Sequence, residues 1–272
     1  MLVLITSYFM KRSFNKFKML IDIGANLTDG MYKGIYNGTQ RHEPDLHCVL
    51  SRAWDTGIKH IVVTGGSLSE SKEALELVKQ DVGCHPTRCK EFEESGDPEK
   101  YLQDLEELVK SAGSKVSAYG EFGLDYDRLQ FCDKETQIKY LKRQLEIASR
   151  CKLPLFLHCR NSASDLADIL AEQNETFKEV VKQLPLERIL FETDAPWCEV
   201  RPSHAGSKLI KSKAPAANKK EKWSANAMVK SRNEPCTILQ ILEIVSSCKG
   251  ITAEELEKEV YQNTTSLFTN IV

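Results

Sequence analysis

The chain has 272 residues, of which 41% are hydrophobic and 28% charged, and its formal net charge is −2. This is the composition of a globular protein long enough for one barrel-sized core. The near-neutral charge favours no class of partner, and no stretch approaches the roughly 18 apolar residues of a membrane-spanning helix.

The nine cysteines are scattered, and none forms a Cys-x-x-Cys pair. This pattern predicts reduced thiols in an intracellular protein, in the nucleus or the cytoplasm, without a disulfide framework. Residues 1–18 begin with apolar side chains and continue with basic ones, without an acid. They predict a leader of unknown structure, and a mitochondrial presequence is the weaker alternative.

Strands and helices alternate through the first eighty residues. Leu46, Val49 and Ala53 lie at helical spacing, and Gly57 ends that helix. Ser67 is a predicted N-cap, with Glu70 at the capping-box distance. The predicted elements are a strand over 20–24, a loop over 26–38, a helix over 43–56, a strand over 60–65 and a helix over 67–80.

The third strand is unusually short, because only Asp81 and Val82 separate the preceding helix from Gly83-Cys-His-Pro86. Strands usually take about five or six residues. A buried strand over 116–125 follows, and its last residue is a carboxylate. The other elements predicted in this part are helices over 98–112 and 134–151 and a strand over 153–158.

Between His158 and Asp194 the sequence holds mainly helical and polar patterns and one strand, over 188–194. Two helices, over 236–247 and 253–267, close the chain. The alternation implies a parallel sheet, most simply an eight-stranded barrel of about 250 residues. Only six strands are recognisable. We therefore predict one α/β domain over 19–272, a TIM-type barrel that is incomplete because two strands are absent after His158.

Ligand-type side chains end three of the predicted strands. Glu121, His158 and Asp194 each follow an apolar run, and the C-terminal ends of barrel strands share one face. One imidazole and two carboxylates suit a divalent cation, foremost Mg²⁺ and otherwise Mn²⁺ or Zn²⁺. Each residue alone could equally be a hydrogen-bonded polar group at a loop junction. The three together favour a metal site for phosphodiester hydrolysis.

Four further residues lie beside these strand ends. Asp22 and Asn26, at the exit of the first strand, are additional candidate ligands. His85 could orient a phosphate or the attacking water, or could simply bond within the turn before Pro86. Glu192, close to Asp194 in the sequence, is a candidate to assist catalysis together with His85.

Candidate contacts to a substrate are basic or amide side chains. Arg160 and Asn161 directly follow His158, and Arg232 lies in a loop near the C-terminal helices. Each could bind a phosphate or form an ordinary surface salt bridge. The lysine-rich residues 200–226 could follow a nucleic-acid backbone, with Trp223 stacking on a base, or could form a solvated loop.

Six motifs in this order resemble the TatD metal-dependent deoxyribonucleases, from about Phe17 to the C-terminus. The resemblance implies a TIM barrel, a divalent metal site and hydrolysis of DNA phosphodiesters, including 3′→5′ exonuclease action. The motifs are Asp22-Ile-Gly-Ala-Asn-Leu-Thr28, Gly83-Cys-His-Pro86, Gly120-Glu-Phe-Gly-Leu-Asp125, Leu157-His-Cys-Arg-Asn161, Glu192-Thr-Asp-Ala-Pro-Trp197 and Arg232-Asn-Glu-Pro235.

By position, Glu121, His158 and Asp194 match metal ligands of that family, and His85 matches a residue near the substrate phosphate. Two departures stand out. Gly24 and Asn26 replace a His-x-His pair that many members carry on the first strand. A further ligand histidine, at the end of the sixth strand, has no counterpart between His158 and Asp194. The resemblance therefore implies a variant that lacks strands six and seven, with impaired activity.

Two other functional classes remain open from the sequence. One is a catalytically inactive barrel remnant that binds nucleic acid or a protein. The other is a metal-dependent amidohydrolase of small molecules on the same barrel, which the basic residues after Lys208 disfavour.

Overall fold

The computed structural model describes residues 19–77, 80–166, 169, 185–203, 205–213 and 215–269. Its contacts divide the chain into two compact units. The first unit contains the described residues of Met1–Val63 and Leu186–Ser266, and the second contains those of Thr64–Pro185 and Leu267–Val272.

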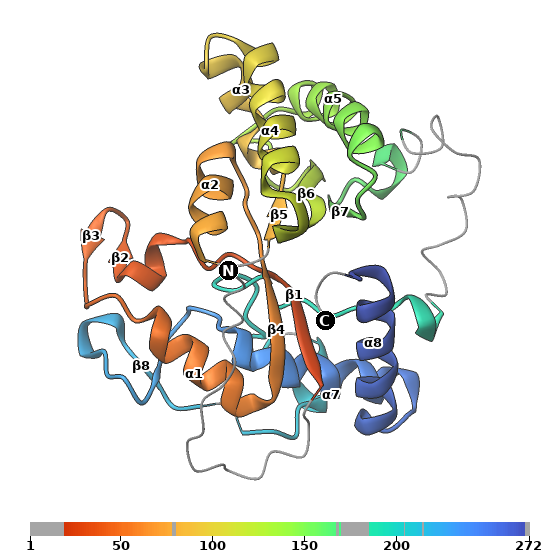
Figure 1. Ribbon diagram of the computed structural model, residues 1–272. Helices are drawn as coiled ribbons and strands as arrows, with labels where there is room; N and C mark the ends of the chain where they lie inside the picture. Colours follow the sequence, from red (N-terminus) through yellow and green to blue (C-terminus); the bar gives the residue numbers. More distant parts are fainter. Residues whose placement is uncertain are drawn as a thin grey trace. The chain divides into compact units, whose positions relative to one another are not determined.

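In the first unit, two buried parallel strands, β1 (Leu20–Ala25) and β4 (Ile58–Val63), pair with Asp22 opposite Ile61. The helix α1 (Leu46–Thr56) precedes β4 in the chain and ends at Gly57, whose φ of 105° lies in the left-handed region. These elements confirm the first two predicted strands and the helix between them. Figure 1 labels them together with α7 (Ile238–Lys249) and α8 (Ala253–Leu267).

The rest of the first unit consists of short elements. The predicted loop over 26–38 includes a 3-10 turn and the first strand of a small hairpin. The bounds of these elements are η1 (Gly30–Lys33), β2 (Ile35–Tyr36), β3 (Thr39–Gln40), η4 (Leu186–Arg188), η5 (Ala205–Leu209), β8 (Ala217–Asn218), η6 (Lys220–Lys222), β9 (Met228–Val229) and η7 (Pro235–Thr237).

The predicted strand over 188–194 is not formed as a strand. The segment runs beside β1 and bonds to it: Ile23 N–H donates to the Phe191 carbonyl at 3.0 Å and Asp194 N–H to the Gly24 carbonyl at 2.9 Å. Only Ala195 forms a bridge, with Ala25. Asp194 has φ of +52°, so the backbone leaves the extended conformation at the point where the strand was expected to end.

In the second unit, three parallel strands lie in the order β5 (Gln80–Val82), β6 (Val116–Asp125) and β7 (Leu155–Arg160). The three residues of β5 confirm the short third strand. Both long helices begin and end as predicted. The helices and 3-10 turns of this unit are α2 (Leu68–Leu77), η2 (Pro86–Arg88), α3 (Lys90–Glu94), α4 (Pro98–Ala112), η3 (Gly113–Lys115) and α5 (Lys134–Cys151).

Side-chain caps explain where three helices of the second unit, α2, α4 and α5, begin. The carboxylate of Asp97 accepts the backbone N–H of Lys100, and that of Asp133 accepts the N–H of Thr136, both at 2.9 Å. Ser67 accepts the N–H of Glu70 at 3.2 Å, which confirms the predicted N-cap. Each such cap typically stabilises a helix by about 1 kcal/mol.

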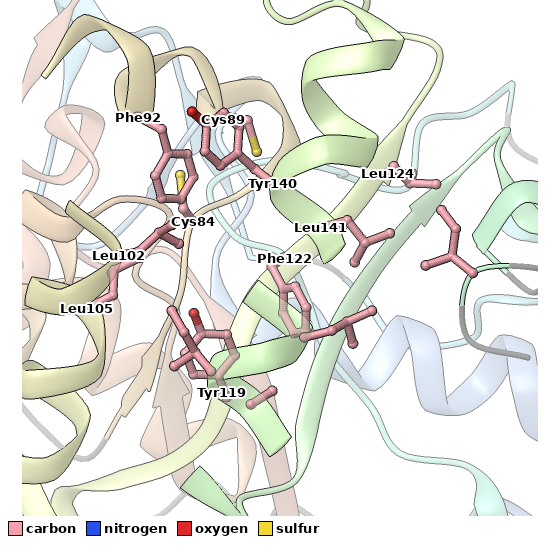
Figure 2. Close-up of a cluster of buried hydrophobic side chains, with 14 of the residues drawn as sticks. Cys84, Cys89, Phe92, Leu102, Leu105, Tyr119, Phe122, Leu124, Tyr140 and Leu141 are labelled. Carbon is pink, nitrogen blue, oxygen red and sulfur yellow. The ribbon is translucent and has the colours of Figure 1, made fainter. Parts of the chain in front are cut away.

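An apolar cluster surrounds β6 in the second unit (Figure 2). Phe92 and Tyr140 stack with ring centroids 4.1 Å apart, and Tyr119 meets Phe122 edge to face at 5.2 Å. Nine of the ten residues of β6 are buried, so both faces of the strand are packed. This packing fixes the position of the C-terminal end of β6, at Asp125.

At the other side of this sheet, β7 is much more open. Leu155 is 43% exposed, and no residue of β7 is fully buried. Among the described residues of the second unit, β7 pairs only with β6. The helical pattern predicted after His158 is described only for residues 162–166 and 169, and residues 170–184 lie outside the described part.

Among the described helices, none is both long and apolar enough to cross a bilayer alone. One combination, Pro235–Lys249 with Ala253–Leu267, meets these criteria by length and composition, but it is bent by 108°.

Candidate metal-binding active site

Ligand-type side chains of the second unit meet in the C-terminal halves of β6 and β7 and just after β5. Glu121 and Asp125 come from β6, His158 comes from β7, and His85 follows β5. The close approach of β6 and β7 depends on Gly123. A Cβ atom there would lie 2.0 Å from the His158 carbonyl oxygen, and its φ of +151° disfavours other residues. Strand order and one glycine thus bring these groups together.

His158 is the centre of the cluster. Its Nδ1 lies 2.7 Å from Glu121 Oε1 and 3.1 Å from His85 Nε2, and its Nε2 lies 3.0 Å from Asp125 Oδ2. One ligand atom from each of His85, Asp125 and His158 lies within 4.8 Å of the others. We call Glu121, His85, Asp125 and His158 the site cluster.

The donor set fits a divalent cation. A ligating histidine usually donates its second ring N–H to a carboxylate, which fixes the tautomer and orients the ring. Asp125 is fully buried and can accept this hydrogen bond from Nε2–H of His158. The Nδ1 lone pair then faces Glu121 and His85. Glu121 and Nδ1 of His158, completed by water, suit Zn²⁺ or Mn²⁺ and, through the carboxylate, Mg²⁺.

His85 is held in place by its own turn. Its Nδ1 lies 2.7 Å from Thr87 Oγ1 and accepts the Thr87 backbone N–H at 3.2 Å, so Nε2 is the atom directed at the cluster. Burial lowers the pKa of His85 well below its usual value, and the nearby His158 and Arg128 lower it further. The ring is therefore neutral at neutral pH.

Two predicted substrate contacts lie around this cluster. Arg160 Nη1 lies 3.7 Å from Asp125 Oδ2, and Asn161 donates from Nδ2 to Asp127 Oδ1 at 3.1 Å. Sequence reasoning recognised Asp125 as a strand end but missed it as a member of the site. Its signal was present, because Asp125 ends the same strand that carries Glu121.

The other predicted ligands lie in the first unit. Asn26 donates from Nδ2 to Asp194 Oδ1 at 3.0 Å, and Cys198 donates from Sγ to Asp194 Oδ2 at 3.0 Å. Asn26 thus positions the carboxylate of Asp194. Glu192 is exposed, while Phe191 and Thr193 are buried, so Glu192 and Asp194 alternate with the core-facing residues. The ligand roles of Asp194 and Asn26 and the catalytic role of Glu192 stay predictions.

Asp22, which was predicted as a ligand, is bonded to groups of the protein. Its carboxylate is fully buried and accepts hydrogen bonds from Thr193 Oγ1 at 2.6 Å, Thr193 N–H at 3.0 Å and Gly24 N–H at 3.2 Å. Both oxygens are thereby engaged by protein donors, and Asp22 joins β1 to the segment that carries Asp194. Burial raises the pKa of Asp22 to about 7, against the effect of these hydrogen bonds.

This pKa predicts how stability depends on pH. Between about pH 4 and pH 7 the folded chain holds a proton on Asp22 that the unfolded chain has released. The stabilisation from Asp22 is therefore complete below about pH 4 and is lost as the pH rises to about 7. Relative to wild type, Asp22→Asn should gain a few kcal/mol of unfolding free energy across this range. Urea unfolding at several pH values measures it, and a constant difference between the two proteins would contradict it.

Arg232, which was predicted as a substrate contact, takes part in buried ion pairs. Its side chain is wholly buried, and its two terminal nitrogens bind Asp45 Oδ1 at 2.8 Å and Asp45 Oδ2 at 2.7 Å. Glu234 Oε1 accepts from it at 2.9 Å and also from Arg52 at 3.1 Å. The guanidinium therefore ties α1 to the segment before α7, and a substrate phosphate has no access to it.

The aromatic residue of the lysine-rich segment is engaged as well. Trp223 donates from Nε1 to Asp45 Oδ2 at 2.9 Å, and its ring stacks on His42 with centroids 5.7 Å apart. The predicted stacking of Trp223 on a nucleic-acid base would have to compete with these contacts.

Comparison with known proteins decides the family. The family described as TatD related DNase matches residues 21–176 and 171–269 of the chain. The chain belongs to the TatD-related DNase family. A "Deoxyribonuclease Tat-D" of Schizosaccharomyces pombe is 37% identical over 306 residues, covering 95% of this chain and 98% of the relative. A "3'-5' ssDNA/RNA exonuclease TatD" of Erwinia tasmaniensis is 27% identical and covers 92% and 99%.

The solved structures agree with the TatD assignment. The crystal structure of a hydrolase TatD family protein from Entamoeba histolytica matches with a TM-score of 0.82 and 36% identity, covering 93% of this chain and 99% of that one. The fold is therefore that of the TatD family, as predicted. The family matches this chain in two pieces that meet at residues 171–176, between His158 and Asp194, where two strands were predicted to be absent.

Proposed function

We propose that this TatD-family chain is a hydrolase of ester bonds, a divalent-metal-dependent deoxyribonuclease with 3′→5′ exonuclease action. The observation that carries the proposal is the site cluster, in which His158 stands between two carboxylates and beside a neutral histidine. The names of two relatives, a deoxyribonuclease and a 3′-5′ exonuclease, support the choice of substrate and polarity.

Glu121 and Nδ1 of His158 would hold the cation, for which we propose Mg²⁺, with Mn²⁺ and Zn²⁺ as alternatives. A cation bound there polarises a phosphoryl oxygen and lowers the pKa of a bound water. Asp125 keeps the His158 ring in place by accepting a hydrogen bond from Nε2–H. Asp194 stays a predicted ligand from its position in the sequence.

The residues around the cluster suit a phosphate group. The neutral His85 can hydrogen-bond to a phosphate oxygen or exchange a proton with water. Arg160, beside Asp125, offers a charged donor, and guanidinium groups match phosphate geometry well. We propose Arg160 and Asn161 as the groups that place the scissile phosphate. A cellular location in the nucleus or the cytoplasm stays a prediction.

The proposal is tested with the full chain and single-stranded DNA labelled at its 5′ end. We expect stepwise loss of nucleotides from the 3′ end in Mg²⁺ or Mn²⁺, none in a chelator and none with Glu121→Ala. Absence of cleavage with Mg²⁺, Mn²⁺ and Zn²⁺ would contradict it. If salt-sensitive DNA binding then persists, the chain is an inactive member of the family that binds nucleic acid.

A further inference from the structure

We propose that Gln137 and Gln144 of α5 are positioning residues that set the spacing of His85 and Asp125 before any ligand binds. This inference rests on the proposed metal site and names the part of the chain that shapes it. Neither glutamine belongs to a motif that the family resemblance brought out, and neither touches the ring or carboxylate atoms of the site cluster.

The side-chain amide of each glutamine hydrogen-bonds to both the backbone N–H and the backbone carbonyl of one residue. Gln144 accepts the Cys84 N–H at 2.8 Å and donates to the Cys84 carbonyl at 3.0 Å. Gln137 accepts the Asp125 N–H at 2.7 Å and donates to the Asp125 carbonyl at 3.0 Å and to the Cys132 carbonyl at 2.8 Å. A primary amide used in this way substitutes for a neighbouring strand, because it offers one donor and one acceptor side by side.

The two residues held in this way, Cys84 and Asp125, lie next to or within the site cluster. Asp125 is itself a member of the site cluster, and Cys84 immediately precedes His85. The two glutamines are seven residues apart, which is close to two helical turns, so both point from the same face of α5 at positions about 10 Å apart. One rigid helix therefore fixes the ends of β5 and β6 relative to each other.

Both amides are fully buried. Burying a primary amide is unfavourable unless its hydrogen bonds are made, and an apolar side chain would be the ordinary choice on the core face of a helix. A close contact nearby shows how little freedom the strand ends have, since a Cβ atom on Gly83 would lie 2.7 Å from the backbone of Gly120. The two buried amides therefore fix the positions of the two strand ends beside the site cluster, in addition to contributing to stability.

The test measures binding of Mn²⁺ alone to the full chain by calorimetry, together with thermal unfolding of each variant. Gln144→Met and Gln137→Met keep the approximate size of the side chain and remove its hydrogen bonds to the backbone. We expect each to weaken Mn²⁺ binding by about tenfold or more, as the loss of groups that orient ligands commonly does. Leu105→Ala, a buried position on α4, is the matched control. It should lower the unfolding temperature and leave the Mn²⁺ affinity of the folded protein unchanged.

Wild-type Mn²⁺ affinity in the folded methionine variants would overturn the inference, because a purely structural role predicts that result. If a methionine variant does not fold, Gln→Asn at the same position takes its place. This change shortens the amide by one methylene and is expected to weaken Mn²⁺ binding in the same direction. Failure of the proposed function looks different, since the wild-type chain itself would then bind no Mn²⁺.

Discussion

Replacing His158 by alanine should reduce the hydrolysis of DNA by about a thousandfold or more. The ring contacts Glu121, Asp125 and His85, so its removal takes away one proposed ligand and leaves the others without their common partner. A cation that stabilises transition-state charge contributes several kcal/mol, and each 1.36 kcal/mol corresponds to about a factor of ten in rate. Initial rates of nucleotide release at saturating Mg²⁺ measure the effect.

The matched control is His47→Ala, an exposed histidine on α1 in the first unit. It should leave the rate unchanged. His158 contributes little to the apolar core, so His158→Ala should keep its cooperative unfolding, and Mn²⁺ should no longer raise its unfolding temperature. An active His158→Ala variant with a normal response to Mn²⁺ would remove the site cluster from the mechanism.

Replacing Arg232 by alanine should lower the free energy of unfolding by about 3 to 5 kcal/mol, because it leaves the buried carboxylate of Asp45 without its cation and leaves Glu234 paired with Arg52 alone. Arg232→Lys should recover only part of this loss, since an ammonium group cannot reproduce the two parallel hydrogen bonds to Asp45. Urea unfolding at pH 7 measures the difference.

Arg201→Ala is the control, because Arg201 is 74% exposed and lies 3.6 Å from Glu199 at the surface. It should cause little measurable change in stability. A marginal loss for Arg232→Ala, accompanied by weaker DNA binding in the folded protein, would restore Arg232 as a substrate contact.

Local rules predicted most elements of the second unit. Both long helices, α4 and α5, were predicted to the residue, and in the first unit Gly57 correctly ended α1. The segment before Asp194 was mistaken for a strand because it is an apolar run that ends in ligand-type residues. It bonds to β1 through Phe191 and Asp194, and its bridge forms only at Ala195, beyond the left-handed Asp194, a conformation that no single residue preference predicts.

The site was predictable as a set of residue types and less so as a set of contacts. Glu121, His85 and His158 do lie together, because parallel strands end at one edge of the sheet. Asp22 and Arg232 have the same residue types as ligands and phosphate contacts, yet both are buried and bonded to protein groups. The sequence pattern places a carboxylate near a strand end, whereas the direction of its oxygens depends on tertiary partners such as Thr193.

β7 carries a residue of the proposed active site and also exposes surface through which chains can aggregate. His158 lies near the C-terminal end of β7, and Leu155 at the start of the strand is exposed to solvent. Within the described residues of its unit, the backbone of β7 hydrogen-bonds to a neighbouring strand on one side only. Such a strand is a template for chain-to-chain pairing. The fission yeast relative aligns over 306 residues, more than this chain possesses, so it carries segments that are missing here. We therefore expect this chain to be limited by aggregation even where its site cluster is formed.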